Sequence, residues 1–225
     1  MNTMRNILLA SLLTAGSATA AVWTASDNTV GAIPDGSSAG LARSLNMSTA
    51  GQAITSVEVS LNVSATSGGA AFLGDLYVYV TNGTHLAVLA NRPGRRAGAD
   101  AGYSDDQSMN VSFSPLASAD LHNYRLTVTG SHATALSGML TGLWEADGRA
   151  SDPASVLDSD ARTAGLDVFT GDIGDGTWSL FAADLSSGAT HQINSWALTI
   201  TTIPEPGSAF MLLAGSLVLA SRRRR

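Results

Sequence analysis

Hydrophobic and polar residues alternate with a period of two over several short stretches of this 225-residue chain. In SVEVSLNVS, residues 56–64, three valines and a leucine share one face and polar residues the other, which is typical of a half-buried strand. The segment GDLYVYVTNGTHLAVL alternates on both sides of Asn82-Gly83, a pair that favours a tight hairpin turn. The same pattern predicts strands at residues 109–113, 124–128, 177–182 and 194–201.

No segment has the convincing 3.6-residue period of an amphipathic helix. Short strands separated by Gly, Asn, Asp and Ser turns predict an all-β domain, an antiparallel β-sandwich or jelly roll (galactose-binding-like). Residues 141–167 are too polar and irregular for a strand pair, so we expect a long loop that crosses the sandwich. Trp144 lies in this stretch and is the tryptophan expected to contact a ligand. Trp178 and Trp196 share the inward register of neighbouring leucines and are expected in the core.

Residues 1–20 are typical of a secretory signal peptide that forms a removable helix. Arg5 precedes an apolar run at 7–16 and a stretch of small residues, in which Ala18 and Ala20 form the A-x-A pair before the cut by signal peptidase. An uncleaved anchor is the alternative, but the apolar run is too short and no charged stop follows it.

Residues 203–225 form a second export segment. Pro204, Glu205 and Pro206 precede the apolar stretch 207–221, and the chain then ends on four arginines, Arg222, Arg223, Arg224 and Arg225. As a helix this stretch measures about 22 Å, less than the ~30 Å hydrocarbon core, so spanning needs snorkelling arginines or a thinned bilayer. The positive-inside rule keeps the arginines in the cytoplasm and leaves the body of the protein outside.

A Pro-Glu-Pro motif, a short transmembrane segment and a basic terminus, in this order, resemble the PEP-CTERM sorting signal of Gram-negative bacteria. The resemblance implies that an exosortase recognises residues 204–206 and cuts near them. An intermediate anchored in the inner membrane would then pass to the cell surface or the exterior, often among exopolysaccharides. An ordinary tail anchor is the alternative.

Residues 21–202 remain as one domain, long enough to bury a core without cysteine, of which the chain has none. Counted from residue 21 to Glu205, the chain holds 7 of the 12 basic residues, all arginine, against all 18 carboxylates, a net charge of −11. Such an acidic domain disfavours nucleic acid and anionic lipid as partners and suits solubility or cation binding. Arg92, Arg95 and Arg96 form a basic island that we expect at a solvated hairpin tip.

Several motifs of the domain resemble the P domain, also called P/Homo B. They are IPD at 33–35, GDL at 74–76, L-x-N-R at 89–92, GTWSL at 176–180 and NSWALTI at 194–200. In that family such motifs build a jelly roll that accompanies subtilisin-like proprotein convertases. The resemblance implies an accessory role, because the catalytic Asp, His and Ser of those proteases belong to a separate domain for which this chain has no room. The stretch 144–167 departs from the family pattern.

Candidate chemistry is sparse. Gly36-Ser37-Ser38-Ala39-Gly40 matches G-x-S-x-G by chance, because a nucleophile elbow needs a strand before the serine and a helix after it. The four histidines show no metal-ligand spacing and are expected on the surface or in strands. Oxygen-rich loops at the edge of a sandwich suit calcium, which P-domain relatives bind in some cases. The candidate ligands are Asp75, Asp105 and Asp106.

The sequence therefore predicts a non-enzymatic surface or extracellular-matrix protein, with exopolysaccharide as a candidate partner. The alternative is an accessory module for a separate subtilisin-like serine protease. A hydrolase would need a triad or metal site that these residues do not supply.

Overall fold

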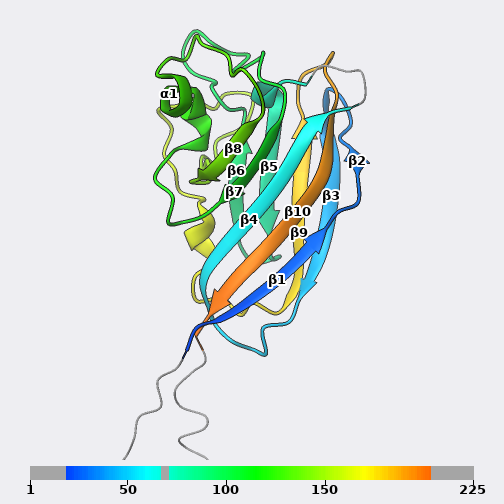
Figure 1. Cartoon of the computed structure of the whole chain (residues 1–225), viewed down its shortest axis with the longest axis vertical. Helices are drawn as coiled ribbons and strands as arrows, with labels where there is room; N and C mark the ends of the chain where they lie inside the picture. Colours follow the sequence, from blue (N-terminus) through cyan, green and yellow to red (C-terminus); the bar gives the residue numbers. More distant parts are fainter. Residues whose placement is uncertain (1–18, 67–70, 204–225) are drawn as a thin grey trace, which may run out of the picture.

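The computed structural model of the chain describes residues 19–66 and 71–203. Two β-sheets face each other, and loops with a few short helical turns cover one side of the sandwich (Figure 1). This is the all-β fold that the alternation predicts. The signal helix, the membrane segment and the motif at 204–206 lie outside the described residues. Within the described part of the chain, no helix has the length and apolarity needed to cross a membrane.

The larger sheet has the strand order β1-β10-β4-β7-β8, and the short β2 pairs with β10 beside it. Its strands are β1 (Ala21–Asp27), β2 (Gly31–Ala32), β4 (Ile54–Ala65), β7 (Met109–Phe113), β8 (Leu140–Trp144) and β10 (His191–Thr202). The smaller sheet has the order β3-β9-β5-β6. Its strands are β3 (Ser37–Met47), β5 (Leu76–Thr81), β6 (Leu86–Asn91) and β9 (Gly176–Asp184).

Most predicted strands are confirmed. The stretch 56–64 lies within β4, residues 109–113 form β7, and the hairpin around Asn82-Gly83 joins β5 to its antiparallel partner β6. Gly83 has a φ of 87°, which the tight turn requires and which glycine adopts at little cost. The pairing of β7 with β8 is parallel, in contrast to the antiparallel arrangement expected throughout.

One strand prediction is wrong. Residues predicted as a strand at 124–128 form the helix α1 (Tyr124–Thr129), which follows the turn η2 (Leu121–Asn123) and ends at Gly130 with a φ of 76°. The residues alternate there as in a strand, but the preceding turn η2 is capped by Asp120, which accepts a hydrogen bond from the His122 amide, and Gly130 caps the end of α1. The long loop predicted at 141–167 is present at 145–165, while its first four residues belong to β8 and its last two to the turn η3 (Leu166–Phe169).

The core lies between the two sheets. Trp178 and Trp196 are 0% and 1% exposed, as their inward register predicts. Trp178 packs against Phe169 with ring centroids 4.7 Å apart, so η3 closes one edge of the core. Large buried aromatic rings of this kind supply much of the apolar area removed from water on folding.

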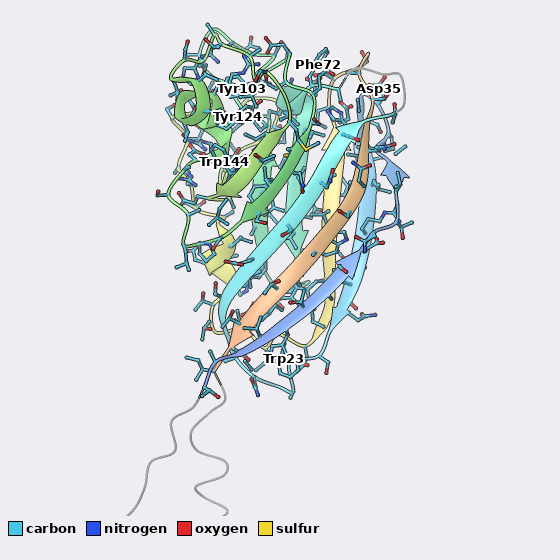
Figure 2. All side chains as sticks on the ribbon, in the orientation of Figure 1. Trp23, Asp35, Phe72, Tyr103, Tyr124 and Trp144 are labelled. Atoms are coloured by element: carbon cyan, nitrogen blue, oxygen red, sulfur yellow. The ribbon has the colours of Figure 1, made fainter. Side chains whose placement is uncertain are left out.

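The two ends of the described chain lie side by side. β1 pairs with β10 so that Ala21 faces Thr202 (Figure 1). At its other end, β10 begins at His191, which is hydrogen-bonded to Asp184 at the end of β9. Twelve residues of strand separate these two ends by about 36 Å. We call the end that holds Asp184 and His191 the distal pole; Figure 2 shows Asp35 and Phe72 at this end and Trp23 at the other.

Candidate functional site

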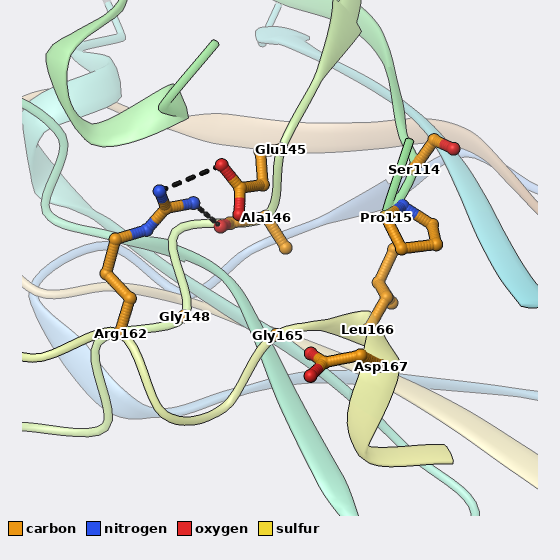
Figure 3. A pocket seen from close by; sticks show the side chains of 9 residues that line it. All are labelled: Ser114, Pro115, Glu145, Ala146, Gly148, Arg162, Gly165, Leu166 and Asp167. Atoms are coloured by element: carbon orange, nitrogen blue, oxygen red, sulfur yellow. Dashed lines mark hydrogen bonds and ion pairs between the residues drawn. The ribbon is translucent and has the colours of Figure 1, made fainter. Parts of the chain in front are cut away.

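One hollow of about 290 Å³ opens beside η3 and β8 (Figure 3). Arg162 lies in its wall and donates to Glu145 Oε2 and to the carbonyls of Ala146 and Asp147, at 2.9, 2.7 and 2.9 Å. The guanidinium is therefore occupied by acceptors of the protein itself. With the exposed carboxylate of Asp167 also in the wall, the hollow has acidic character and offers no donor set for an anion.

A second hollow, of about 440 Å³, lies at the distal pole. The ends of all four strands of the smaller sheet converge there, because Asp184 pairs with both Ser37 and Leu76, and Tyr77 pairs with Asn91. A loop of the 145–165 region closes the other side. The residues that line this hollow, which we call the distal hollow, are Ser38, Tyr77, Arg92, Asp152, Pro153, Ala154, Ala183 and Leu185.

Arg92 is held in the wall of the distal hollow by several contacts. Its Nε donates to the Gly74 carbonyl at 3.1 Å and its Nη2 to Ser186 Oγ at 3.1 Å, while Asp75 Oδ1 lies 3.6 Å from Nη2. The residue has a φ of 49°, a left-handed conformation that costs a non-glycine residue about 1 kcal/mol. Such strain persists only where the surroundings enforce it, and it occurs preferentially at functional sites.

A buried histidine–aspartate pair lies next to the distal hollow, where Asp184 stands between the lining residues Ala183 and Leu185. His191 Nδ1 is 2.6 Å from Asp184 Oδ2, and both side chains are fully buried. Burial raises the pKa of the neighbouring Asp75, and the nearby charge of Asp184 adds to the effect. Ala183 and Leu185 give the hollow an apolar part next to this pair, while the lining residues Ser38 and Asp152 are polar and exposed.

The three predicted calcium ligands do not converge. Asp75 faces Arg92, whereas Asp105 and Asp106 both pair with Arg125. Asp106 accepts three hydrogen bonds at 2.5–2.7 Å, from the hydroxyl of Tyr124, Nε of Arg125 and the amide of Leu136. Among the described residues, no group of three or more acidic, histidine or cysteine side chains is arranged to hold a metal ion. The carboxylates at 105 and 106 have a structural role around an arginine.

Trp144 is in the core, not in a loop. It ends β8, is 4% exposed, and donates from Nε1 to the Thr141 carbonyl at 3.0 Å. Its ring lies edge-on to Tyr124 at 6.4 Å; Figure 2 shows both near Tyr103. The prediction of a ligand contact at Trp144 is therefore wrong. Pairing with the parallel strand β7 places this residue inside the sandwich.

Sequence reasoning missed a buried network of charges around His122. The histidine is fully buried, so its assignment to the surface or to a strand is wrong. Its Nδ1 lies 2.9 Å from Asp147 Oδ2 and its Nε2 lies 2.8 Å from the Arg95 carbonyl. Because both partners are acceptors, the ring satisfies both only as the doubly protonated imidazolium. Asp147 also accepts from Arg149, which reaches on to Asp120 at 2.9 Å.

The pKa of His122 follows from these contacts. Burial favours the neutral ring, but the hydrogen bond and the charge of Asp147 outweigh it and raise the pKa of His122. No sequence pattern predicts the pairing of His122 with Asp147, because the two residues lie 25 positions apart and share no periodic segment.

The remaining candidates occupy unrelated places. Ser38 of the G-x-S-x-G match is the second residue of β3, and the described chain continues from it as strand. Arg92 and Arg95 are only 12% exposed, so the basic island is anchored and is not a solvated hairpin tip. Ala20 is exposed directly before β1, whereas Ala18 and the sorting residues at 204–206 and 222–225 lie outside the described residues.

No family model matches the chain, and no curated protein matches its sequence. Among solved structures, a chain in the crystal structure of the Aeromonas sobria serine protease in complex with its chaperone is similar, with 12% identity and a TM-score of 0.45 over 83% of this chain. The A. sobria serine protease solved by itself gives 12% identity and a TM-score of 0.44 over 82%. This chain spans about a quarter of those chains, 27% in both comparisons.

Proposed function

We propose that this chain is an exported, non-enzymatic protein: a jelly roll of the P-domain type that an exosortase delivers to the cell surface or extracellular matrix. In this proposal it acts by binding through its distal pole. The signal peptide is removed after Ala20, and the segment 203–225 anchors an intermediate in the inner membrane until it is cut near residues 204–206.

The pairing of β1 with β10 is the observation that supports this proposal most directly. Because Ala21 and Thr202 face each other, both processed segments leave the domain at the same end. A tail held in a membrane would therefore present the distal pole to the exterior, about 36 Å further out. The distal hollow is at that pole, so it would face a partner and not the membrane.

Intact mass of the mature protein, isolated from envelope and medium fractions of the producing cells, tests the delivery route. We expect loss of residues 1–20 together with loss of the tail near Glu205. A variant with residues 204–206 replaced by alanines should keep the tail and stay in the membrane fraction. Wild-type protein that retains the four terminal arginines would rule out the exosortase route.

The P-domain resemblance implies the alternative partner, a separate subtilisin-like serine protease. Deletion of the gene for this chain from the producing strain distinguishes the proposed surface-protein role from the accessory role for a protease. Under our proposal, the amount and activity of secreted serine protease stay unchanged. A severalfold loss of protease activity, restored by the chain supplied from a plasmid, would assign it the accessory role instead.

A further inference from the structure

We propose that the distal hollow is a carbohydrate-binding site for neutral polysaccharide, with Tyr77 as the stacking ring and Arg92 and Asp152 as the partners of neighbouring sugar hydroxyls. This inference deepens the proposed function by naming the class of ligand that the displayed pole binds.

Aromatic rings lead out of the distal hollow across the smaller sheet. On β5 the residues Leu76, Val78 and Val80 are fully buried, so the residues between them point outward. The rings of Tyr77 and Tyr79 lie 5.8 Å apart, and Tyr79 stacks on Phe181 of β9 at 4.9 Å. All three are partly exposed on the outer face, although outward positions of a sheet are usually polar. Rings left half open to water offer apolar surface to a ligand.

The polar groups of the hollow include both donors and acceptors. Arg92 uses Nε and Nη2 for protein contacts, and no described residue accepts a hydrogen bond from its Nη1. Asp152 accepts from the Ala154 amide through Oδ1, at 2.8 Å, which leaves Oδ2 available. Ser38 adds an exposed hydroxyl that can donate or accept.

This combination fits a sugar ring better than the other common classes of ligand. A pyranose presents apolar C–H groups on its faces and hydroxyls around its edge, so it matches an aromatic ring flanked by a donor and an acceptor. The hollow lies within the usual 300–1,000 Å³ range of ligand sites. The guanidinium of Arg92 faces two carboxylates, the buried Asp75 and Asp152 of the lining, so the hollow disfavours polyanions on a domain that is already acidic. The row of rings extends the site for further units of a chain.

Affinity electrophoresis tests this assignment. The protein isolated from the producing cells is run through gels that contain a β-1,4-glucan, a β-1,3-glucan, a galactomannan or dextran, and through gels that contain alginate, a polyuronate. We expect retardation by at least one neutral polysaccharide. Tyr77→Ala and Asp152→Asn should each weaken that binding roughly tenfold, as expected for the loss of about 1.4 kcal/mol.

Matched variants separate the contact from the fold. Tyr77→Phe keeps the ring and should retain binding, and Asp167→Asn in the acidic hollow should bind like the wild type. Tyr77→Phe, Asp152→Asn and Asp167→Asn should keep the wild-type thermal midpoint, whereas Tyr77→Ala, which removes a partly buried ring from Tyr79, should lower it by a few degrees and still be folded in the gel. Retardation by alginate alone, by no polysaccharide of the panel, or equally in wild type and Tyr77→Ala would overturn the assignment. A failure here leaves the intact-mass result unaffected, so the delivery route is judged independently.

Discussion

Asp106→Ala is expected to lower the free energy of unfolding by about 3–5 kcal/mol, the cost of breaking a buried ion pair by removing one partner. The Asp106 side chain is fully buried and accepts from Tyr124, Arg125 and Leu136. Its loss would leave these buried donors without an acceptor, and Arg125, only 5% exposed, would keep one carboxylate partner that solvent screens. Urea unfolding at neutral pH gives the value.

The neighbouring residue provides the control. Asp105 also pairs with Arg125, but its side chain is 56% exposed, so Asp105→Ala should cost no more than about 1 kcal/mol. Nothing in the sequence distinguishes Asp105 from Asp106. Equal losses in the two variants would mean that burial does not distinguish their roles.

Stability should also fall as the pH is raised from 6 to 9, because of His122. An unfolded histidine has a pKa of about 6.5, and the folded pKa of His122 is raised by the hydrogen bond and charge of Asp147 despite burial. Below 6.5 the ring is charged in both states, so its stabilising contribution is fully present. As the pH rises through the folded pKa, the ring loses its proton and one of its two hydrogen bonds to acceptors, and the contribution disappears.

Urea unfolding at pH 6, 7, 8 and 9 measures this dependence. His122→Asn should be less stable than the wild type at pH 6 and should lose less stability between pH 7 and 9. His132→Asn is the control: burial and Arg96 lower the pKa of His132, so its contribution changes below that range. A wild-type profile parallel to that of His122→Asn would contradict the charged state assigned to the buried ring.

The strands with strict alternation could be predicted because one face of each is buried and the other is not. β4 and β7 are examples, and so is the β5–β6 hairpin, where the turn residues fix the register. The helix α1 could not, because YRLTV alternates as a strand does, and only Asp120, which caps the preceding turn η2, and the C-cap Gly130 favour helical turns there. These caps are single residues, which carry less signal than five alternating positions.

Local sequence patterns could predict neither β8 nor the candidate site. In β8 a glycine and a threonine interrupt the apolar positions, and its burial comes from the parallel partner β7. The distal hollow joins Ser38, Tyr77, Arg92 and Asp152, which come from four separate parts of the chain. Motifs could be recognised in some of these parts one at a time. That the four side chains meet at one hollow depends on the strand order β3-β9-β5-β6, which no local pattern specifies.

The position of β10 makes folding depend on the last part of the domain to be synthesised. This strand lies between β1 and β4, and its Thr202 hydroxyl accepts a hydrogen bond from Trp23 Nε1 of β1 at 3.0 Å, across 179 positions of sequence. Until residues 191–202 emerge, β1 has no neighbour in its sheet and β4 keeps an open edge, which is a template for association with other chains. Such non-local pairing is slow to form, so the domain completes its larger sheet only after synthesis of its carboxyl end. A chain shortened before β10 would expose its core strands and aggregate.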